Sequence, residues 1–437
     1  MTAKVPSAPD APSRRISALD FFLIVMVVVM PNLRRFSFSI LPGLNLLNIL
    51  FMFVLYFMHK EATERADKRP SASAPAGGYM LFFWVVSFMA MLNAMLMSEV
   101  PASMNDVIFY KNHIFYMGLY FVYFHAVRTR RSLDLVYWTL IIVTAIAGLE
   151  AVRQRMSFGG SGYSTGVRVS GPFGAGWENS NVAGVFYAQF ASIIFAEMLF
   201  QKEKLLKLGL LGAFIVAVMG LFYTYSRKAY YAFAAAAVLM GSTASKWVLI
   251  VITAVVLTFP VWAPESAVER LMGNAEEKAD HAGPDESTES RYILWAGAMS
   301  MWQDHPVGVG LERFKHYIGQ YSPISNLDAH NYYVLVFAEM GPLGEFAYLL
   351  MVFMMYREGS KLGKVARTPR EKALASGFRG TMVSYIICNT FGSAFNFGEM
   401  MGNLWVLAGL VSRMRLMIEQ EIADEKKKTA PARSMMA

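Results

Sequence analysis

The sequence predicts an all-α, polytopic membrane protein with about twelve transmembrane helices. Its largest hydrophilic loop, on the far side of the membrane from the N-terminus, contains short amphipathic helices. Hydrophobic residues make up 55% of the 437 residues and charged residues only 16%, whereas a soluble domain carries about 25% charged residues. Apolar runs of about 17 to 25 residues recur along the whole chain, and a helix of that length crosses the hydrocarbon core of a bilayer. A soluble globular fold is therefore excluded.

The predicted spans divide most of the chain into membrane helix and loop. Residues 1–17 before them are rich in Pro, Ser and Ala and are expected to be disordered, and residues 419–437 after them form a cytoplasmic tail. Because no convincing cleavage site follows the first apolar run, we expect an uncleaved first helix. The spans lie near 18–31, 36–58, 79–97, 107–127, 133–151, 181–199, 205–224, 229–243, 246–263, 331–355, 374–396 and 403–418.

The distribution of positive charge predicts the orientation. With a cytoplasmic N-terminus, Lys and Arg concentrate in short cytoplasmic loops such as 60–69, 128–131 and 357–372. The net charge of +8 therefore reflects the orientation of the chain in the membrane. The sequence contains no basic face or RNA-binding motif, so we do not expect a nucleic-acid partner. Two loops fall on the other side, at about 152–180 and about 264–330. The second has helical patterns at about 288–303 and 311–321, and we expect the chemistry there.

Two arginines are candidates for binding an anion at the outer side. Arg227 stands between two spans with almost no loop, and Arg291 opens the predicted loop helix beside Trp295. A guanidinium presents a rigid fork of donors that suits a phosphate group. Structural roles are open for both: Arg227 could reach out to lipid phosphates, and Arg291 could stack on Trp295 or pair with Glu289.

A histidine and a lysine complete the candidates drawn from residue chemistry. His330 stands at the start of the tenth span, where the helix dipole disfavours the imidazolium, so the ring should stay neutral near pH 7 and be able to accept a proton. The alternative is a helix cap or anchor. Lys111 lies about one turn inside the outer end of the fourth span, where a cation indicates function by default. It could also extend outward to the membrane surface.

Several kinds of site are missing from the sequence. It has no Asp-x-Asp pair, no His-Glu-x-x-His, no Walker phosphate loop and no Gly-x-Ser-x-Gly elbow, and its single cysteine, Cys388, lies in an apolar run. We therefore expect neither a metal nor another cofactor. An enzyme that stabilises a leaving diphosphate without a metal needs fixed cationic donors in its place, and the two arginines meet that demand.

The order of four segments resembles the O-antigen ligase and O-antigen polymerase superfamily of bacterial membrane glycosyltransferases. Each motif alone is weak, but the shared order and spacing over about 170–355 make the set specific. The segments are Gly171-Pro172-Phe173 with Glu178 to Gly184, then Ser226-Arg227, then Arg291 and Trp295 with His305 to Gly310 and Phe314, and finally Ala329-His330-Asn331 with Glu339 to Gly344.

The resemblance implies an enzyme of the bacterial inner membrane whose active site faces the periplasm. It implies that Arg227 and Arg291 hold the diphosphate of a polyprenyl-diphosphate-linked glycan donor and that His330 serves the acceptor. We also expect Lys111, Asn179, Asn181, Trp295 and Asn331 to bind the substrate. The chain departs from its relatives where many have Asn-Pro-Asn, which leaves helix capping as the alternative for Asn179 and Asn181.

The acceptor is left open among a second lipid-linked glycan, lipid A-core and a protein. We favour a repeat-unit polymerase, since the outer loop has no strongly basic cluster for the phosphates of lipid A-core. Membrane lipids and other polysaccharide-assembly proteins are further expected partners. A lipid-linked glycan flippase or a secondary transporter is the alternative of another class, although we find no two related halves.

Overall fold

The computed structural model describes residues 16–33, 44–64, 72–159, 167–174, 177–272 and 286–429. Within these ranges the chain is helical and forms no strand, which confirms the all-α class. The predicted disordered start falls almost wholly outside them. The α-helices are α1 (Ala18–Val29), α2 (Leu46–Thr63), α3 (Gly77–Leu96), α4 (Met104–Ala126), α5 (Arg130–Ser157), α6 (Trp177–Phe200), α7 (Lys204–Tyr223), α8 (Arg227–Ala244), α9 (Lys246–Leu257), α10 (Phe259–Trp262), α11 (Glu265–Met272), α13 (Glu286–Asp304), α14 (Phe314–Tyr317), α15 (Tyr332–Val365), α16 (Pro369–Thr390) and α17 (Gly398–Thr429). Short 3-10 helices are η1 (Met30–Asn32), η3 (Gly171–Phe173), η4 (Ile318–Gln320) and η5 (Ala394–Asn396).

The helices support a multi-pass membrane protein. Each of the twelve predicted spans overlaps a helix, while α1 and α9 are shorter apolar helices. The count of twelve spans and the periplasmic position of the loop stay predictions. Among the described residues, six helices are long and apolar enough to cross a membrane, namely those over Leu46–Thr63, Gly77–Leu96, Arg130–Ser157, Asn179–Phe200, Lys204–Tyr223 and Tyr332–Val365.

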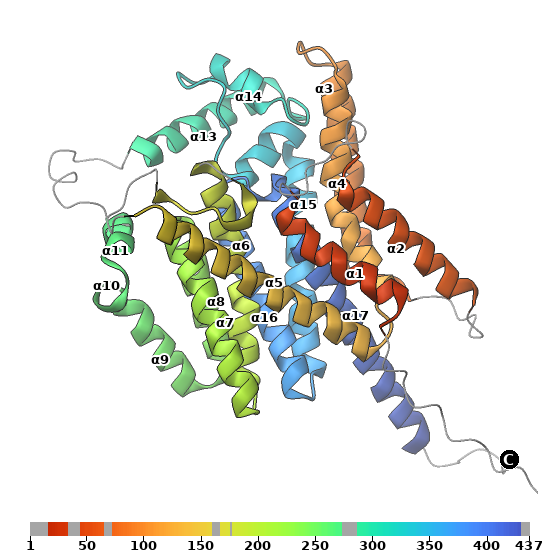
Figure 1. Cartoon of the computed structure of the whole chain (residues 1–437). Helices are drawn as coiled ribbons and strands as arrows, with labels where there is room; N and C mark the ends of the chain where they lie inside the picture. Colours follow the sequence, from red (N-terminus) through yellow and green to blue (C-terminus); the bar gives the residue numbers. More distant parts are fainter. Residues whose placement is uncertain are drawn as a thin grey trace, which may run out of the picture.

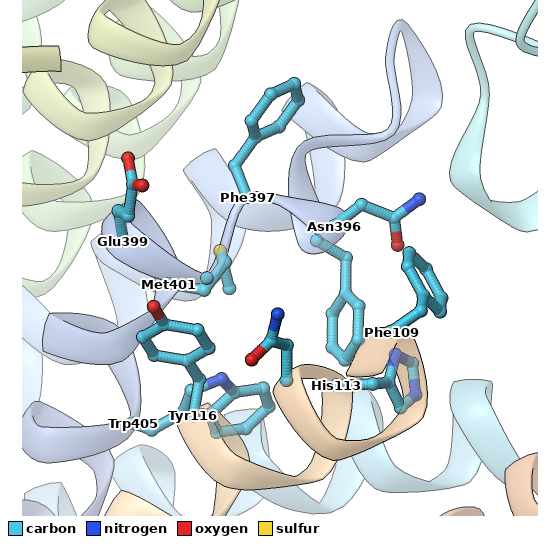
Figure 2. Close-up of a pocket in the computed structure, with 11 residues that line it drawn as sticks. Phe109, His113, Tyr116, Asn396, Phe397, Glu399, Met401 and Trp405 are labelled. Atoms are coloured by element: carbon cyan, nitrogen blue, oxygen red, sulfur yellow. The ribbon is translucent and has the colours of Figure 1, made fainter. Parts of the chain in front are cut away.

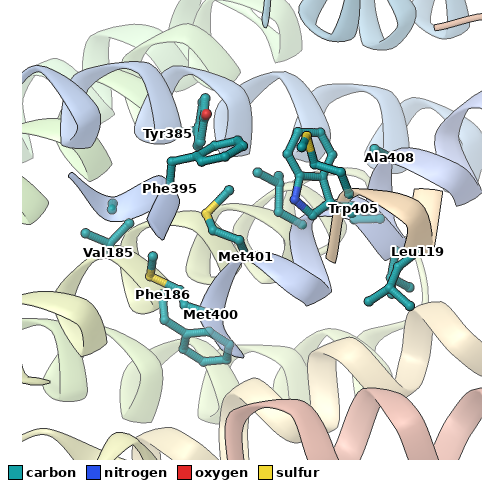
Figure 3. Packing of buried hydrophobic residues seen from close by; sticks show 14 of the residues in the cluster. Leu119, Val185, Phe186, Tyr385, Phe395, Met400, Met401, Trp405 and Ala408 are labelled. Atoms are coloured by element: carbon teal, nitrogen blue, oxygen red, sulfur yellow. The ribbon is translucent and has the colours of Figure 1, made fainter. Parts of the chain in front are cut away.

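The long helices form a bundle with α13 and α14 across one end, and the C-terminal end of α17 lies toward the other (Figure 1). Helix α16 packs against α6, α8 and α15, while α17 packs against α4. Residues 400–412 of α17 are all buried, as expected for a helix inside the bundle instead of at its lipid surface. Figure 3 shows Met400, Met401 and Trp405 among side chains of neighbouring helices.

Ion pairs tie the helices together at the end away from α13. Arg130 at the start of α5 bridges Glu371 of α16, at 2.7 Å, and Glu421 of α17, at 2.8 Å. Arg370 pairs with Glu197 of α6 at 2.9 Å, and its guanidinium lies 4.0 Å from the Tyr137 ring centroid. Two of the loops predicted to be cytoplasmic, at 128–131 and 357–372, thus meet at one end of the bundle, and their charges join helices.

Helix α15 is interrupted near its start, and the loop before it donates hydrogen bonds to backbone carbonyls next to the interruption. Gly341 takes a left-handed backbone (φ 65°), and Pro342 has no N–H to donate to the carbonyl of Ala338, four residues earlier. That carbonyl accepts instead from the Val309 N–H, at 3.0 Å, and the Glu339 carbonyl accepts from Gly310 N–H, at 3.0 Å. The Gly-Val-Gly and Glu-Met-Gly-Pro-Leu-Gly motifs are therefore two halves of one contact.

Glycine is required on the loop side of this contact. A Cβ on Gly308 would lie 2.4 Å from the Glu339 carbonyl oxygen, and one on Gly310 would lie 2.6 Å from the Ala94 Cα. Both residues also have positive φ angles, of 88° and 97°. The loop backbone can thus lie directly against α15 and α3.

A buried ion pair fixes the same loop to α4. Arg313 donates from Nη1 to Asp106 Oδ1 at 2.7 Å and from Nη2 to Asp106 Oδ2 at 2.9 Å. Both side chains are almost fully buried, and the pair lowers the pKa of the Asp106 carboxyl. The predicted helix over 311–321 is correspondingly shorter, because Glu312 has a left-handed backbone (φ 61°) and only α14 and η4 follow it.

We predict that Arg313→Met lowers the free energy of unfolding by about 3–5 kcal/mol, because it leaves the Asp106 carboxylate buried without its partner. The measurement is chemical unfolding of the detergent-purified chain. Asp106→Asn combined with Arg313→Met should cost less than the sum of the two single substitutions.

The control is Arg367→Met, which breaks a geometrically similar pair with Glu425, at 2.7 Å, whose side chains are 45% and 60% exposed. This substitution should cost under about 1 kcal/mol. Equal losses for the buried and exposed pairs would show that the Arg313 pair does not anchor the loop.

Candidate functional site

Three segments meet at the end of the bundle covered by α13, and they bring basic side chains together. They are the start of α8, the start of α13 and the turn before α15. Lys228, Arg291 and His330 lie close enough for their charges to act on one another, and Arg168 lies within range of Lys228. We call Arg168, Lys228, Arg291 and His330 the cation cluster.

A sharp turn and a close helix approach position the start of α8. Tyr225 has a left-handed backbone (φ 50°), so the chain passes from α7 into α8 almost without a loop. The Tyr225 hydroxyl lies 2.9 Å from Ser266 Oγ, and a Cβ on Gly184 of α6 would lie 2.8 Å from Ser226 Cβ. The N-terminus of α8, with its partial positive charge, is thereby held against α6.

Two consecutive cations open α8. Arg227 and Lys228 are about 100° apart around the helix, and both are half-buried. Lys228 lies within range of the charges of Arg291 and Asp328. The structure therefore brings Lys228 into the cation cluster, with Arg227 beside it at the same helix end.

Arg168 reaches the site from the loop before α6. Its Nε donates to the Thr224 carbonyl at 2.9 Å, and its Nη2 donates to Asn181 Oδ1 at 2.7 Å. The Val169 N–H donates to the Tyr223 carbonyl at 3.0 Å, which lays this loop against the end of α7. The structure thus gives the amide of Asn181 a role in holding a cation next to α8.

Helix α13 carries Arg291 and is docked through Trp295. The Trp295 indole donates from Nε1 to the Ala329 carbonyl at 2.8 Å, and Leu294, Ala298 and Met301 are buried on the same helix. This contact sets α13 against the residue before His330. Trp295 is therefore a positioning residue in this structure.

The backbone of His330 is unusual. Its φ angle is 51°, a left-handed conformation that costs free energy for a residue with a Cβ. Asp328 supports the turn, because its Oδ1 accepts from the His330 N–H at 2.7 Å and from Ser393 Oγ at 2.6 Å. Asn331 caps α15 by accepting from the N–H groups of Tyr333 and Val334. The sequence-based prediction placed His330 at the helix start, and it lies one residue before this cap.

Burial lowers the pKa of His330, and positive neighbours lower it further. The charges of Arg291, Lys228 and Lys315 disfavour the imidazolium, while Asp328 opposes them. The neutral ring expected from the sequence is thus favoured, but mainly because the ring leaves water and lies among cations. A half-buried neutral imidazole can accept a proton.

Two more predicted site residues lie on α4 and α6. Lys111 is half-buried in α4, about two turns from its start. Asn179 lies within the first turn of α6 instead of capping it. In the part of the chain that the structure describes, no three His, Cys, Asp or Glu side chains gather into a set able to hold a metal ion.

The arrangement can bind an anion and accept a proton beside it. Arg168, Lys228 and Arg291 supply donors from three separate elements, with Asp328 as a nearby negative charge. Fixed cations of this kind stabilise developing negative charge on a phosphate oxygen. A neutral His330 next to them could take a proton from an attacking hydroxyl group.

Sequence reasoning missed Arg168 and Lys228. Lys228 could have been found from the helix period, since it shares a side of α8 with a stripe of small residues at 232 and 236. Arg168 lies in a Gly- and Ser-rich loop with no periodicity, and only the folded contact with Thr224 reveals it.

A comparison with known families matches residues 212–349 to a family model described as O-antigen ligase. The match begins in α7 and ends in α15, and it contains Arg227, Lys228, Arg291 and His330. The resemblance seen in the sequence is confirmed over this range. No curated protein matches the chain.

We predict that His330 titrates below its ordinary pKa of 6.5. Asp328→Asn should lower the pKa further by removing a negative charge, and Lys315→Gln should raise it by removing a positive one. Histidine NMR of the ¹³C-labelled chain in nanodiscs measures the titration, and His330→Asn identifies the resonance. A pKa at or above 6.5 in the unsubstituted protein would contradict the burial of a neutral ring.

Proposed function

We propose that this chain, whose residues 212–349 match the O-antigen ligase model, transfers glycan from a polyprenyl-diphosphate carrier to an acceptor hydroxyl at the periplasmic face of the bacterial inner membrane. The family match supports an O-antigen ligase- or polymerase-type glycosyltransferase in the membrane. The observation that carries the finer proposal is the grouping of Lys228, Arg291 and a neutral His330 within the matched segment.

The diphosphate of the donor would bind to the cation cluster. Arg291 and Lys228 would hold its oxygens, and Arg168 would add charge from the other side. Arg227 stands at the same helix end and would contribute where the diphosphate extends toward it. Asn181 would hold Arg168 in place, while Lys111 and Asn179 would contact other parts of the substrate. Because negative charge grows on the diphosphate as it leaves, donors fixed before the reaction stabilise the transition state more than the ground state.

His330 would act as the general base of a single displacement. Its ring takes the proton of the acceptor hydroxyl while that oxygen attacks the anomeric carbon. The bond between the anomeric carbon and the diphosphate oxygen breaks, and polyprenyl diphosphate leaves with the electron pair. The proton then passes from His330 to solvent or to the departing diphosphate. Attack from the side opposite the leaving group inverts the anomeric configuration. The proposed reaction uses no metal ion.

The acceptor we favour is the end of a second lipid-linked glycan, which would make the enzyme a repeat-unit polymerase. Transfer to lipid A-core or to a protein would use the same donor site, so the same chemistry would serve a ligase. The length of the product separates the two: a polymerase yields a ladder of repeats, and a ligase yields a single transfer from the donor supplied.

We predict that His330→Asn lowers the rate of glycan transfer by about 10²–10⁴, as expected for loss of a general base. Asparagine is chosen because it tolerates the left-handed backbone, so the turn should survive. The assay is transfer in proteoliposomes from a purified polyprenyl-diphosphate glycan, with EDTA present. A variant that keeps the unsubstituted rate would remove His330 from the mechanism.

We further predict that Arg291→Met and Lys228→Met each lower the transfer rate by about 10²–10³, through loss of a donor to the diphosphate. Arg227→Met, at the neighbouring position of α8, should also lower the rate. Lys246→Met, which removes an exposed cation at the start of α9, is the matched control and should leave the rate unchanged. Undiminished transfer by both Arg291→Met and Lys228→Met would contradict binding of the diphosphate at the cation cluster.

A further inference from the structure

A cavity lies between α4 and the start of α17. It holds about 200 Å³ and is partly open, so part of a chain molecule could lie in it while the rest stays outside. Figure 2 shows its labelled side chains, which come from α4 and from the stretch between η5 and the start of α17. The lining includes Asn112, Tyr116, Phe395, Asn396, Glu399 and Trp405.

Aromatic rings form much of the wall. Tyr116 and Trp405 both line the cavity, and the edge of the Tyr116 ring lies directly over Gly398, where a Cβ would be 1.9 Å from a ring carbon. The face of an aromatic ring is electron-rich and attracts C–H groups that carry partial positive charge. The C–H faces of a sugar ring are groups of this kind, since each carbon bears an oxygen.

Polar groups stand beside the rings. Asn112 is exposed, Asn396 and Glu399 are half-buried, and all three line the cavity. An amide offers both donors and an acceptor, and a carboxylate offers acceptors, which together match the paired hydroxyl groups of a sugar. A lipid tail would desolvate these groups without compensation, and the Glu399 carboxylate disfavours an anion.

The cavity is joined to the His330 turn by a short path. Ser393 donates to Asp328, which also accepts from the His330 N–H. Ser393 and Asn396 are three residues apart, so their Cα atoms are at most about 11 Å apart. The Phe395 ring between them lies 4.8 Å from the Tyr332 ring at the start of α15. A molecule that reacts at His330 could therefore also reach the cavity.

We propose that this cavity is a sugar-binding subsite for a glycan residue beyond the one that reacts. That glycan residue stacks on Tyr116 and hydrogen-bonds to Asn112, Asn396 and Glu399. The choice of a glycan as occupant rests on the proposed function. The subsite would retain the glycan chain and set its register relative to His330.

The test uses direct binding, separately from transfer. The probe is the oligosaccharide released by mild acid from the polyprenyl-linked glycan of the source cells, added to the full chain in nanodiscs and followed by saturation-transfer NMR. Tyr116→Ala and the exposed Asn112→Ala should each weaken binding at least tenfold, while His330→Asn should bind as the unsubstituted chain does. Tyr56→Ala, which removes a 58% exposed tyrosine from α2, is the control and should have no effect.

The outcomes separate this subsite from the catalytic proposal. Binding that Tyr116→Ala abolishes supports the subsite even if no transfer is found, and a raised KM with unchanged kcat in Asn112→Ala would support its use during transfer. Failure of the unsubstituted chain to bind the oligosaccharide, binding that both substitutions leave intact, or displacement of the probe by polyprenyl phosphate without sugar would overturn it.

Discussion

The break in α15 at Gly341 and Pro342 imposes the constraint on which the candidate site depends. A proline inside a helix leaves a carbonyl without its partner, and in a membrane protein such a group must find a donor within the protein. The N–H groups of Val309 and Gly310 supply it. The loop is therefore tied to α15 by the backbone itself, and the buried pair of Arg313 with Asp106 holds the same loop to α4. These contacts bring α13 over the His330 turn.

The sequence predicted the helical class and the family resemblance, because both depend on local patterns. The length of their apolar runs identifies α3, α5 and α7 as candidate spans. The short sequence motifs around Arg227, Arg291 and His330 can be recognised because they lie between the predicted spans. The helix period also predicted α13, whose buried residues follow the expected spacing.

What could not be predicted depends on contacts between distant segments. Nothing near Arg168 indicates that it lies against Thr224, and nothing near Asp106 indicates a partner 207 positions away. The helix expected over 311–321 was shortened for the same reason, since the Asp106 pair and the left-handed Glu312 hold the backbone out of helical form. The number of membrane spans is also hard to predict, because buried helices such as α16 carry charges that lipid-facing helices avoid.

The ion pairs at the end away from α13 have a mechanical consequence. Arg130 and Arg370 join α5, α6, α16 and α17 there. The opposite end is held by different means, namely the buried pair of Arg313 with Asp106 and the backbone hydrogen bonds from the loop to α15. Loss of the exposed ion pairs at high salt would therefore loosen one end of the bundle and leave the other end in place.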